Sequence, residues 1–168
     1  MDEEILDQPR IKVARDAARK LLKDSGIISF PILLGDIAKK IPDLVIDGVE
    51  LEDEISGMQA TYKGVSFIRY NTRHSTKRNR FTLAHELGHA VLGHTLSCER
   101  SNFSTKNPTE VEANQFAAEL LCPLAMLKKA VKTITTVNDL AKAFWVSKDS
   151  MSWRVLETKV YKNLTSWS

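Results

Sequence analysis

Residues 80–94 read RFTLAHELGHAVLGH, the segment with the clearest structural signal in this chain. His85 and His89 stand four residues apart, and Glu86 directly follows the first histidine. On an α-helix, residues four apart lie about 40° apart around the axis and about 6 Å apart along it, so the two imidazoles can approach one point. The apolar residues around them predict a largely buried helix, in which polar side chains need partners. Gly93 is a typical end for this helix.

The spacing is that of the HExxH metal hydrolases. Zinc accepts neutral histidine nitrogens at roughly 2.0–2.1 Å, which predicts His85 and His89 as metal ligands. Glu86 projects beside the same point, where a carboxylate reaches a water on the metal more readily than the metal itself. Its expected role is therefore that of the catalytic base.

A catalytic zinc usually takes three protein ligands, so a third is expected from the next helical segment. Residues 108–123 read PTEVEANQFAAELLCP and offer the candidates. Glu110 and Asn114 are four apart and share one face, which suits a carboxylate on the metal and an amide that orients a ligating histidine. Glu110 is therefore favoured as the third ligand.

Other side chains remain open as alternatives. Glu112 is the second candidate for the third ligand, although Thr109 and Glu112 also form a capping-box pattern. Glu119, near the end of the same helix, is expected to be solvated. His74 and His94 are expected to be solvated loop histidines, since His94 lies five residues after His89 and turns away from the metal face.

Together these two segments resemble the ImmA/IrrE family of zinc metallopeptidases, and the resemblance covers most of the chain. The family's second motif reads roughly E-x-x-A-N-x-F-A-x-x-L-L-M-P, and residues 110–123 read EVEANQFAAELLCP. Cys122 stands where the family usually has methionine. A smaller apolar side chain at this position is a packing change and predicts no redox chemistry.

The resemblance implies a gluzincin-like peptidase with one Zn²⁺ per chain, held by His85, His89 and Glu110, and with Glu86 as base. It also implies a regulatory antirepressor that cleaves a helix-turn-helix transcriptional repressor in a bacterium, phage or mobile element. Peptide hydrolysis also requires a residue that stabilises the oxyanion. The candidates, which all lie upstream of the HExxH helix, are Tyr62, Tyr70 and His74.

Apolar periodicity and turn residues predict the rest of the fold. Helices are expected at 10–23, 32–40, 109–121 and, in two or three short pieces, 124–161, with a strand at 44–46 and loops at 71–79 and 95–109. Residues 57–71 (GMQATYKGVSFIRYN) predict a hairpin, which is either structural or an edge for a substrate strand. The expected class is α+β: one mainly helical, zincin-like domain over residues 1–168, with a small β-sheet before the HExxH helix and a helix-turn-helix-like subregion at 124–161.

Composition narrows the possible functions. The chain has 168 residues, 43% of them hydrophobic and 27% charged, with a formal charge of +3. This small charge argues against a dedicated nucleic-acid surface. Cys98 and Cys122 form no CxxC unit, and no leader or membrane-length apolar run is present, so a soluble cytoplasmic protein is expected.

Residues 137–156 (VNDLAKAFWVSKDSMSWRVL) resemble a helix-turn-helix. Lys148 and Arg154 are the cations of its second helix, and direct DNA binding is disfavoured. The favoured interpretation is packing onto the protease body or substrate docking, with Val146, Met151, Trp153 and Val155 as the packing residues. The alternative function is a regulator that binds a repressor or DNA through this segment without cutting.

Overall fold

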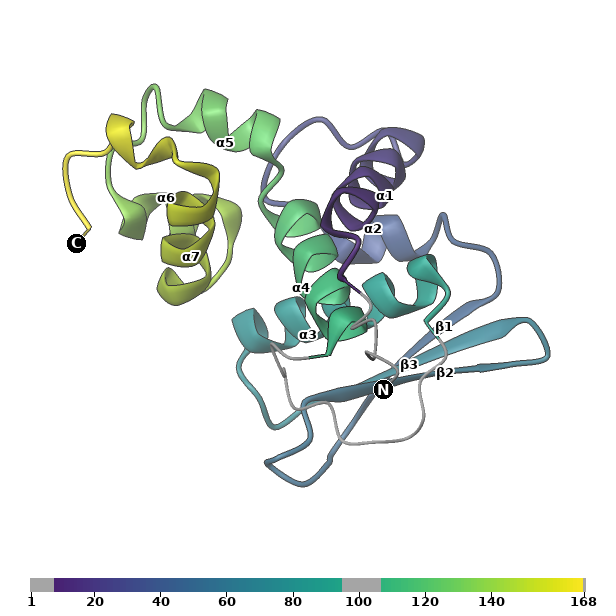
Figure 1. Ribbon diagram of the computed structural model, residues 1–168. Coiled ribbons are helices and arrows are strands. Elements are labelled where there is room, and N and C mark those ends of the chain that lie inside the picture. The colour runs from purple at the N-terminus through teal and green to yellow at the C-terminus, as the bar shows by residue number, and fades with distance from the viewer. Residues whose placement is uncertain (1–7, 95–106, 168) are drawn as a thin grey trace, which may run out of the picture.

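A computed structural model describes residues 8–94 and 107–167. Within these ranges the chain forms seven α-helices, three strands and one 3-10 helix. In chain order they are α1 (Ile11–Asp24), α2 (Leu34–Ala38), β1 (Leu44–Val49), β2 (Gly57–Tyr62), β3 (Val65–Asn71), α3 (Thr76–Leu92), α4 (Pro108–Leu121), α5 (Leu124–Ala130), α6 (Val137–Phe144), α7 (Lys148–Thr158) and η1 (Val160–Asn163). This confirms the predicted α+β class, mainly helical with a small sheet before the HExxH helix (Figure 1).

The three strands form one sheet in the order β1-β3-β2. β1 pairs with β3 in parallel, and β2 pairs with β3 as the antiparallel hairpin that the sequence predicted. Lys63 and Gly64 have φ values of 48° and 83°, as a two-residue type I′ turn requires. Among the strands of the described residues, β2 therefore lies at one edge of the sheet.

The helices α1, α3 and α4 pack around one core. Figure 1 shows α3 and α4 between the sheet and the C-terminal helices α6 and α7. Ala14 and Ala18 of α1 are fully buried, and such small side chains let neighbouring helices approach closely. The predicted core residues of α4 are confirmed as buried: Phe116, Ala117, Leu120 and Leu121.

Two helix starts differ from expectation. α3 begins at Thr76, inside the loop predicted for 71–79, because the Ser75 hydroxyl accepts a hydrogen bond from the Arg78 backbone N–H at 3.4 Å and caps the helix. α2 is shorter than the 32–40 predicted for it. Residues 95–106 of the predicted 95–109 loop, Cys98 among them, lie outside the described residues.

The C-terminal helices have the predicted helix-turn-helix order. α6 ends at Trp145 in a left-handed conformation, and Ser147 caps α7. Val146, Met151 and Val155 are buried as expected. Trp153 was predicted wrongly, because 75% of it is exposed.

Two buried arginines attach these helices to the rest of the chain. Arg80 of α3 donates to the Trp145 carbonyl at 2.9 Å and lies over its indole. Arg154 of α7 donates to the Cys122 carbonyl at 3.0 Å and pairs with Glu119 of α4. The predicted packing of this segment onto the body is thus confirmed. Arg154, 3% exposed, cannot act as a DNA-binding cation on the surface.

In the part of the chain that the structure describes, no helix combines the length and the apolar character needed to cross a membrane.

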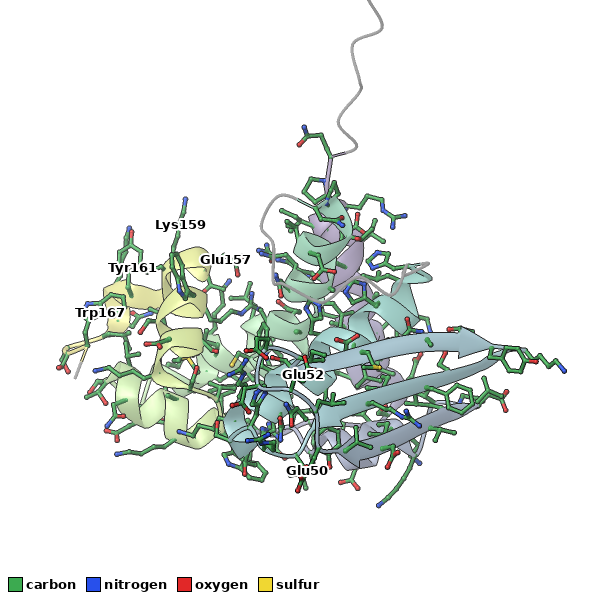
Figure 2. The ribbon with its side chains drawn as sticks, turned by 90° about the horizontal axis from the view of Figure 1, so that it is seen from below. Glu50, Glu52, Glu157, Lys159, Tyr161 and Trp167 are labelled. Atoms are coloured by element: carbon green, nitrogen blue, oxygen red, sulfur yellow. The ribbon has the colours of Figure 1, made fainter. Side chains whose placement is uncertain are left out.

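Figure 2 shows Lys159, Tyr161 and Trp167 on the side of the C-terminal helices that faces away from the sheet.

Candidate metal centre

The centre is built first on α3, where the HExxH residues are buried. His85, Glu86 and His89 are 0%, 2% and 1% exposed. The two histidine side chains turn their Nε2 atoms toward each other, 3.0 Å apart. The four-residue spacing therefore brings both nitrogens to one point, as the sequence predicted.

Gly88, between the histidines, lets α4 approach this point. A Cβ at Gly88 would lie 3.1 Å from the Phe116 ring and 3.2 Å from the backbone of Ala113. A methyl group at this position would require these atoms of α4 to move by a few tenths of an ångström. The close approach brings Glu110 to the histidines.

Glu110 completes the cluster with a carboxylate that places one oxygen near each histidine. Its Oε2 lies 3.2 Å from Nε2 of His85, and its Oε1 lies 3.3 Å from Nε2 of His89. Tetrahedral ligands about 2.05 Å from a zinc ion stand roughly 3.3 Å from one another. The two Nε2 atoms, 3.0 Å apart, are close to this separation, and each lies 3.2 or 3.3 Å from a different oxygen of Glu110. One ligand atom from each residue lies within 4.8 Å of the others, so the three residues could hold a metal ion.

The donor set is also chemically incomplete without a cation. Oε2 of Glu110 is buried and has no hydrogen-bond partner. Nδ1 of His85 lies 2.9 Å from the amide oxygen of Asn114, which only accepts, so Nδ1 carries the proton and Nε2 has a lone pair. A nitrogen lone pair that faces a buried carboxylate oxygen is unfavourable unless a positive ion lies between them. The residues present thus fit a divalent metal.

A series of hydrogen bonds that the sequence did not predict orients His89. Its Nδ1 lies 2.9 Å from Nδ1 of His94, whose Nε2 lies 3.0 Å from Oε2 of Glu112. Glu112 in turn accepts three hydrogen bonds from Arg10. His94 was expected in solvent, but its side chain is 3% exposed.

The two other α4 glutamates also differ from expectation. The capping box is wrong, because Asn107 caps α4 by accepting from the Thr109 N–H at 3.0 Å. Glu112 points instead to Arg10 and His94. Glu119 is 1% exposed rather than solvated, since the buried Arg154 pairs with it. Sequence patterns gave no signal for these long-range ion pairs.

Glu86 is buried beside the cluster. Burial raises its pKa from 4.5 to about 7, with His89 lowering it and Glu110 raising it further. By contrast, burial by itself would raise the pKa of Glu110, whereas the adjacent His85 and His89 side chains lower it to about 2. Two carboxyl groups in one site therefore have pKa values far apart, as an acid–base group and an anionic ligand require.

The edge strand β2 begins next to Glu86. A Cβ at Gly57 would lie 3.5 Å from Oε1 of Glu86, 2.5 Å from Thr82 and 2.9 Å from the Arg69 carbonyl. Only glycine fits between the strand and α3 at this position. The backbone of β2 thus passes directly beside the carboxylate.

The three predicted oxyanion partners lie in different places. Tyr62 is at the far end of β2, about 16 Å along the strand from Gly57. The Tyr70 hydroxyl lies against Gly48 of β1, where a Cβ would be 2.8 Å from it. Nε2 of His74 lies 3.0 Å from the Asp53 carbonyl.

A cavity of about 470 Å³ lies between α4 and α7, lined in part by Asn114, which contacts His85. Phe81 lies one turn before His85, and Asn114 and Ala118 lie one and two turns after Glu110. Trp153 and Glu157 of α7 line the opposite wall. Glu157 points from α7 toward α1 and α4, where Arg15 and Gln115 bind it (Figure 2). The cavity is mainly apolar and suits a hydrophobic side chain.

The fold and the site together define a class. An α+β chain in which one helix supplies HExxH, and the next brings a glutamate to the same point, has the form of a zincin-type metallopeptidase. Residues 51–155 match the IrrE N-terminal-like domain of peptidase M78. This match covers more than half of the chain, so the chain belongs to that family, as its motifs predicted.

Two individual proteins illustrate the relationship. The chain is 36% identical over 95 residues to the uncharacterized immunity region protein 2 of Bacillus phage phi105, covering 54% of this chain and 60% of the phage protein's length. A Mycobacterium tuberculosis transcriptional regulator of known structure superposes with a TM-score of 0.59 at 18% identity, over 86% of this chain and 46% of the regulator. That second likeness shows the fold alone.

Proposed function

We propose that this protein is a zinc-dependent endopeptidase in which His85, His89 and Glu110 bind one metal ion and Glu86 is the general base. The observation that supports this most strongly is the convergence of His85, His89 and Glu110, from two packed helices, with one ligand atom of each residue within 4.8 Å of the others. Glu86, buried beside them, adds the proton-transfer group that peptide hydrolysis needs.

The roles of the residues follow from their chemistry. A zinc ion in this site would polarise the scissile carbonyl and increase the acidity of the attacking water. Glu86 accepts the proton of that water and delivers it to the leaving amine. A pKa of about 7 suits both transfers near neutral pH.

The surroundings of the site suit an extended peptide. An edge strand can pair with a substrate strand through its backbone, and β2 has its first residue, Gly57, beside Glu86. The cavity between α4 and α7 would receive a hydrophobic side chain near the scissile bond. Arg80 and Arg154 hold the C-terminal helices as that cavity's wall, which supports one domain over 1–168 with 124–161 as a helical subregion.

The biological role we propose is that of a cytoplasmic antirepressor that cleaves a helix-turn-helix repressor. Membership of the IrrE-like family and similarity to a phage immunity region protein support a regulatory role of this kind. The alternative is a regulator that binds a repressor, or DNA, without cutting. The exposed Trp153 and Trp145 on the C-terminal helices would suit such binding.

Two measurements test the proposal. Purified protein should carry about one zinc per chain, lost in His85→Ala and Glu110→Ala. With a peptide library digested from a bacterial proteome, the zinc-loaded protein should yield new cleavage products by mass spectrometry, and Glu86→Gln should yield none while keeping its zinc. Cleavage that survives Glu86→Gln would contradict the assignment of the base, and inactivation of a repressor without cleavage would favour the binding alternative.

A further inference from the structure

The second ring nitrogen of each proposed histidine ligand has a different kind of partner. His85 donates from Nδ1 to the amide oxygen of Asn114, so its Nε2 can only accept. His89 meets another imidazole, that of His94, at 2.9 Å. Because a neutral imidazole can either donate or accept, this contact alone does not define which His89 nitrogen carries the proton.

Glu112 removes the ambiguity. A carboxylate only accepts, so the hydrogen bond of 3.0 Å between Glu112 and His94 requires the proton on Nε2 of His94. Nδ1 of a neutral His94 is then an acceptor, and His89 must donate to it from its own Nδ1. The Nε2 atom of His89 is left as a lone pair that points at Glu110 and His85.

We propose that His94 and Glu112, held in place by Arg10, are positioning residues of the metal centre that lock His89 in its metal-binding tautomer. This inference rests on the zinc site proposed above. It assigns a role to residues outside the HExxH motif and its third ligand.

Burial and several hydrogen bonds hold His94 and Glu112 in fixed orientations. The His94 and Glu112 side chains are 3% and 4% exposed. Arg10 donates its backbone N–H at 2.7 Å, its Nε at 3.0 Å and its Nη2 at 2.8 Å to the two Glu112 oxygens. The Arg10 guanidinium pairs with Glu112 at 2.8 Å, so this carboxylate is held as a hydrogen-bond acceptor. The segment before α1, the end of α3 and the first turns of α4 therefore meet in one hydrogen-bond chain.

The alternative tautomer of His89 would interfere with metal binding. If His89 carried its proton on Nε2, that proton would lie between two nitrogens only 3.0 Å apart. His89 would then donate a hydrogen bond to His85 and occupy the point where a metal would sit. Outer partners of this kind commonly change metal affinity about 10–100-fold.

The test compares zinc affinity, by competition with a chelator, and the visible spectrum of the Co²⁺-loaded protein across matched variants. His94→Phe keeps the ring and removes both hydrogen bonds, whereas His94→Asn restores an acceptor near the Nδ1 position, as Asn114 already does for His85. Glu112→Met removes the acceptor that orients His94. Glu119→Met is the matched control, because it removes a buried, arginine-paired carboxylate two turns further along α4. Glu110→Ala tests the metal site itself.

We expect His94→Phe and Glu112→Met to bind zinc about 10–100-fold more weakly and to alter the cobalt spectrum. His94→Asn should recover most of the affinity, and Glu119→Met should lose stability only. Unchanged affinity in His94→Phe and Glu112→Met, or an equal loss in His94→Asn, would overturn the positioning role. If Glu110→Ala also kept its zinc, the metal centre itself would be wrong, so the two failures are distinguishable.

Discussion

Replacing Glu86 with glutamine should stabilise the metal-free protein at pH 8 while it abolishes hydrolysis. Burial raises the pKa of Glu86 from 4.5 to about 7. Below pH 4.5 the group is protonated in both the folded and unfolded states and costs nothing. As the pH rises from 4.5 to about 7, Glu86 ionises in the unfolded state but stays protonated in the folded state. This ionisation favours the unfolded state, so the free energy of unfolding falls.

The size of the effect follows from that difference. At about 1.36 kcal/mol per pH unit, ionising this buried carboxyl costs the folded state about 3 kcal/mol by pH 8. Glutamine has the same shape and no charge, so its free energy of unfolding should exceed that of the wild type by this amount. In a chain of this length the melting temperature should rise by about 6–12 °C.

The assay is urea unfolding of chelator-treated protein at pH 5, 6, 7 and 8. The advantage of Glu86→Gln should be small at pH 5, grow with pH and shrink when zinc is added, because a nearby dication favours the carboxylate. Glu112→Gln provides a control of opposite sign. Hydrogen bonds from Arg10 lower the pKa of Glu112 to about 2, so its contribution is present above about pH 4.5 and is lost as the pH falls toward 2. A Glu86→Gln protein no more stable than the wild type at pH 8 would refute the argument from burial.

Three further changes test other parts of the structure. Gly88→Ala should weaken zinc binding and lower the free energy of unfolding by about 1–3 kcal/mol through overpacking, partly offset by about 1 kcal/mol of helix propensity. Equilibrium dialysis measures the zinc affinity and urea unfolding the stability. A zinc affinity equal to that of the wild type would contradict the close approach of α3 and α4. Arg154→Ala should destabilise the protein by about 3–5 kcal/mol, because it leaves the buried Glu119 paired only with the half-exposed Arg19. Lys148→Ala is the control and should change stability little. Similar urea midpoints for the two variants would show that Arg154 does not stabilise the packing of α7. Ala118→Phe should fill the cavity and raise KM about tenfold or more for peptides with a large hydrophobic side chain, with zinc content unchanged; an unaltered KM would remove the cavity from the substrate site.

Local pattern was a reliable guide wherever one segment contained the whole interaction. The four-residue spacing of His85 and His89 gave a shared helix face, and the structure places their Nε2 atoms 3.0 Å apart. The hairpin was predicted with its turn, because Lys63 and Gly64 can adopt the two positive φ values that the turn requires. Asn114 was predicted to orient a histidine from its spacing to Glu110, and it accepts from His85.

Errors arose where a side chain has its partner far away in the chain. Nothing near Glu112 in the sequence indicates that it binds His94, 18 residues before it, and Arg10, 102 residues before it. Local rules gave it a capping role instead. Glu119 was placed in solvent for the same reason, although Arg154, 35 residues later, pairs with it in the core.

Residue spacing along single helices thus predicted that His85 and His89 share one face, since backbone geometry alone controls which side chains share a face. The packing of α3 against α4 at Gly88 decided that Glu110 is the glutamate that meets both histidines. It also turned His94 inward against His89. These contacts join segments that no local rule connects, because a buried polar side chain takes whichever partner the tertiary fold brings within hydrogen-bonding distance.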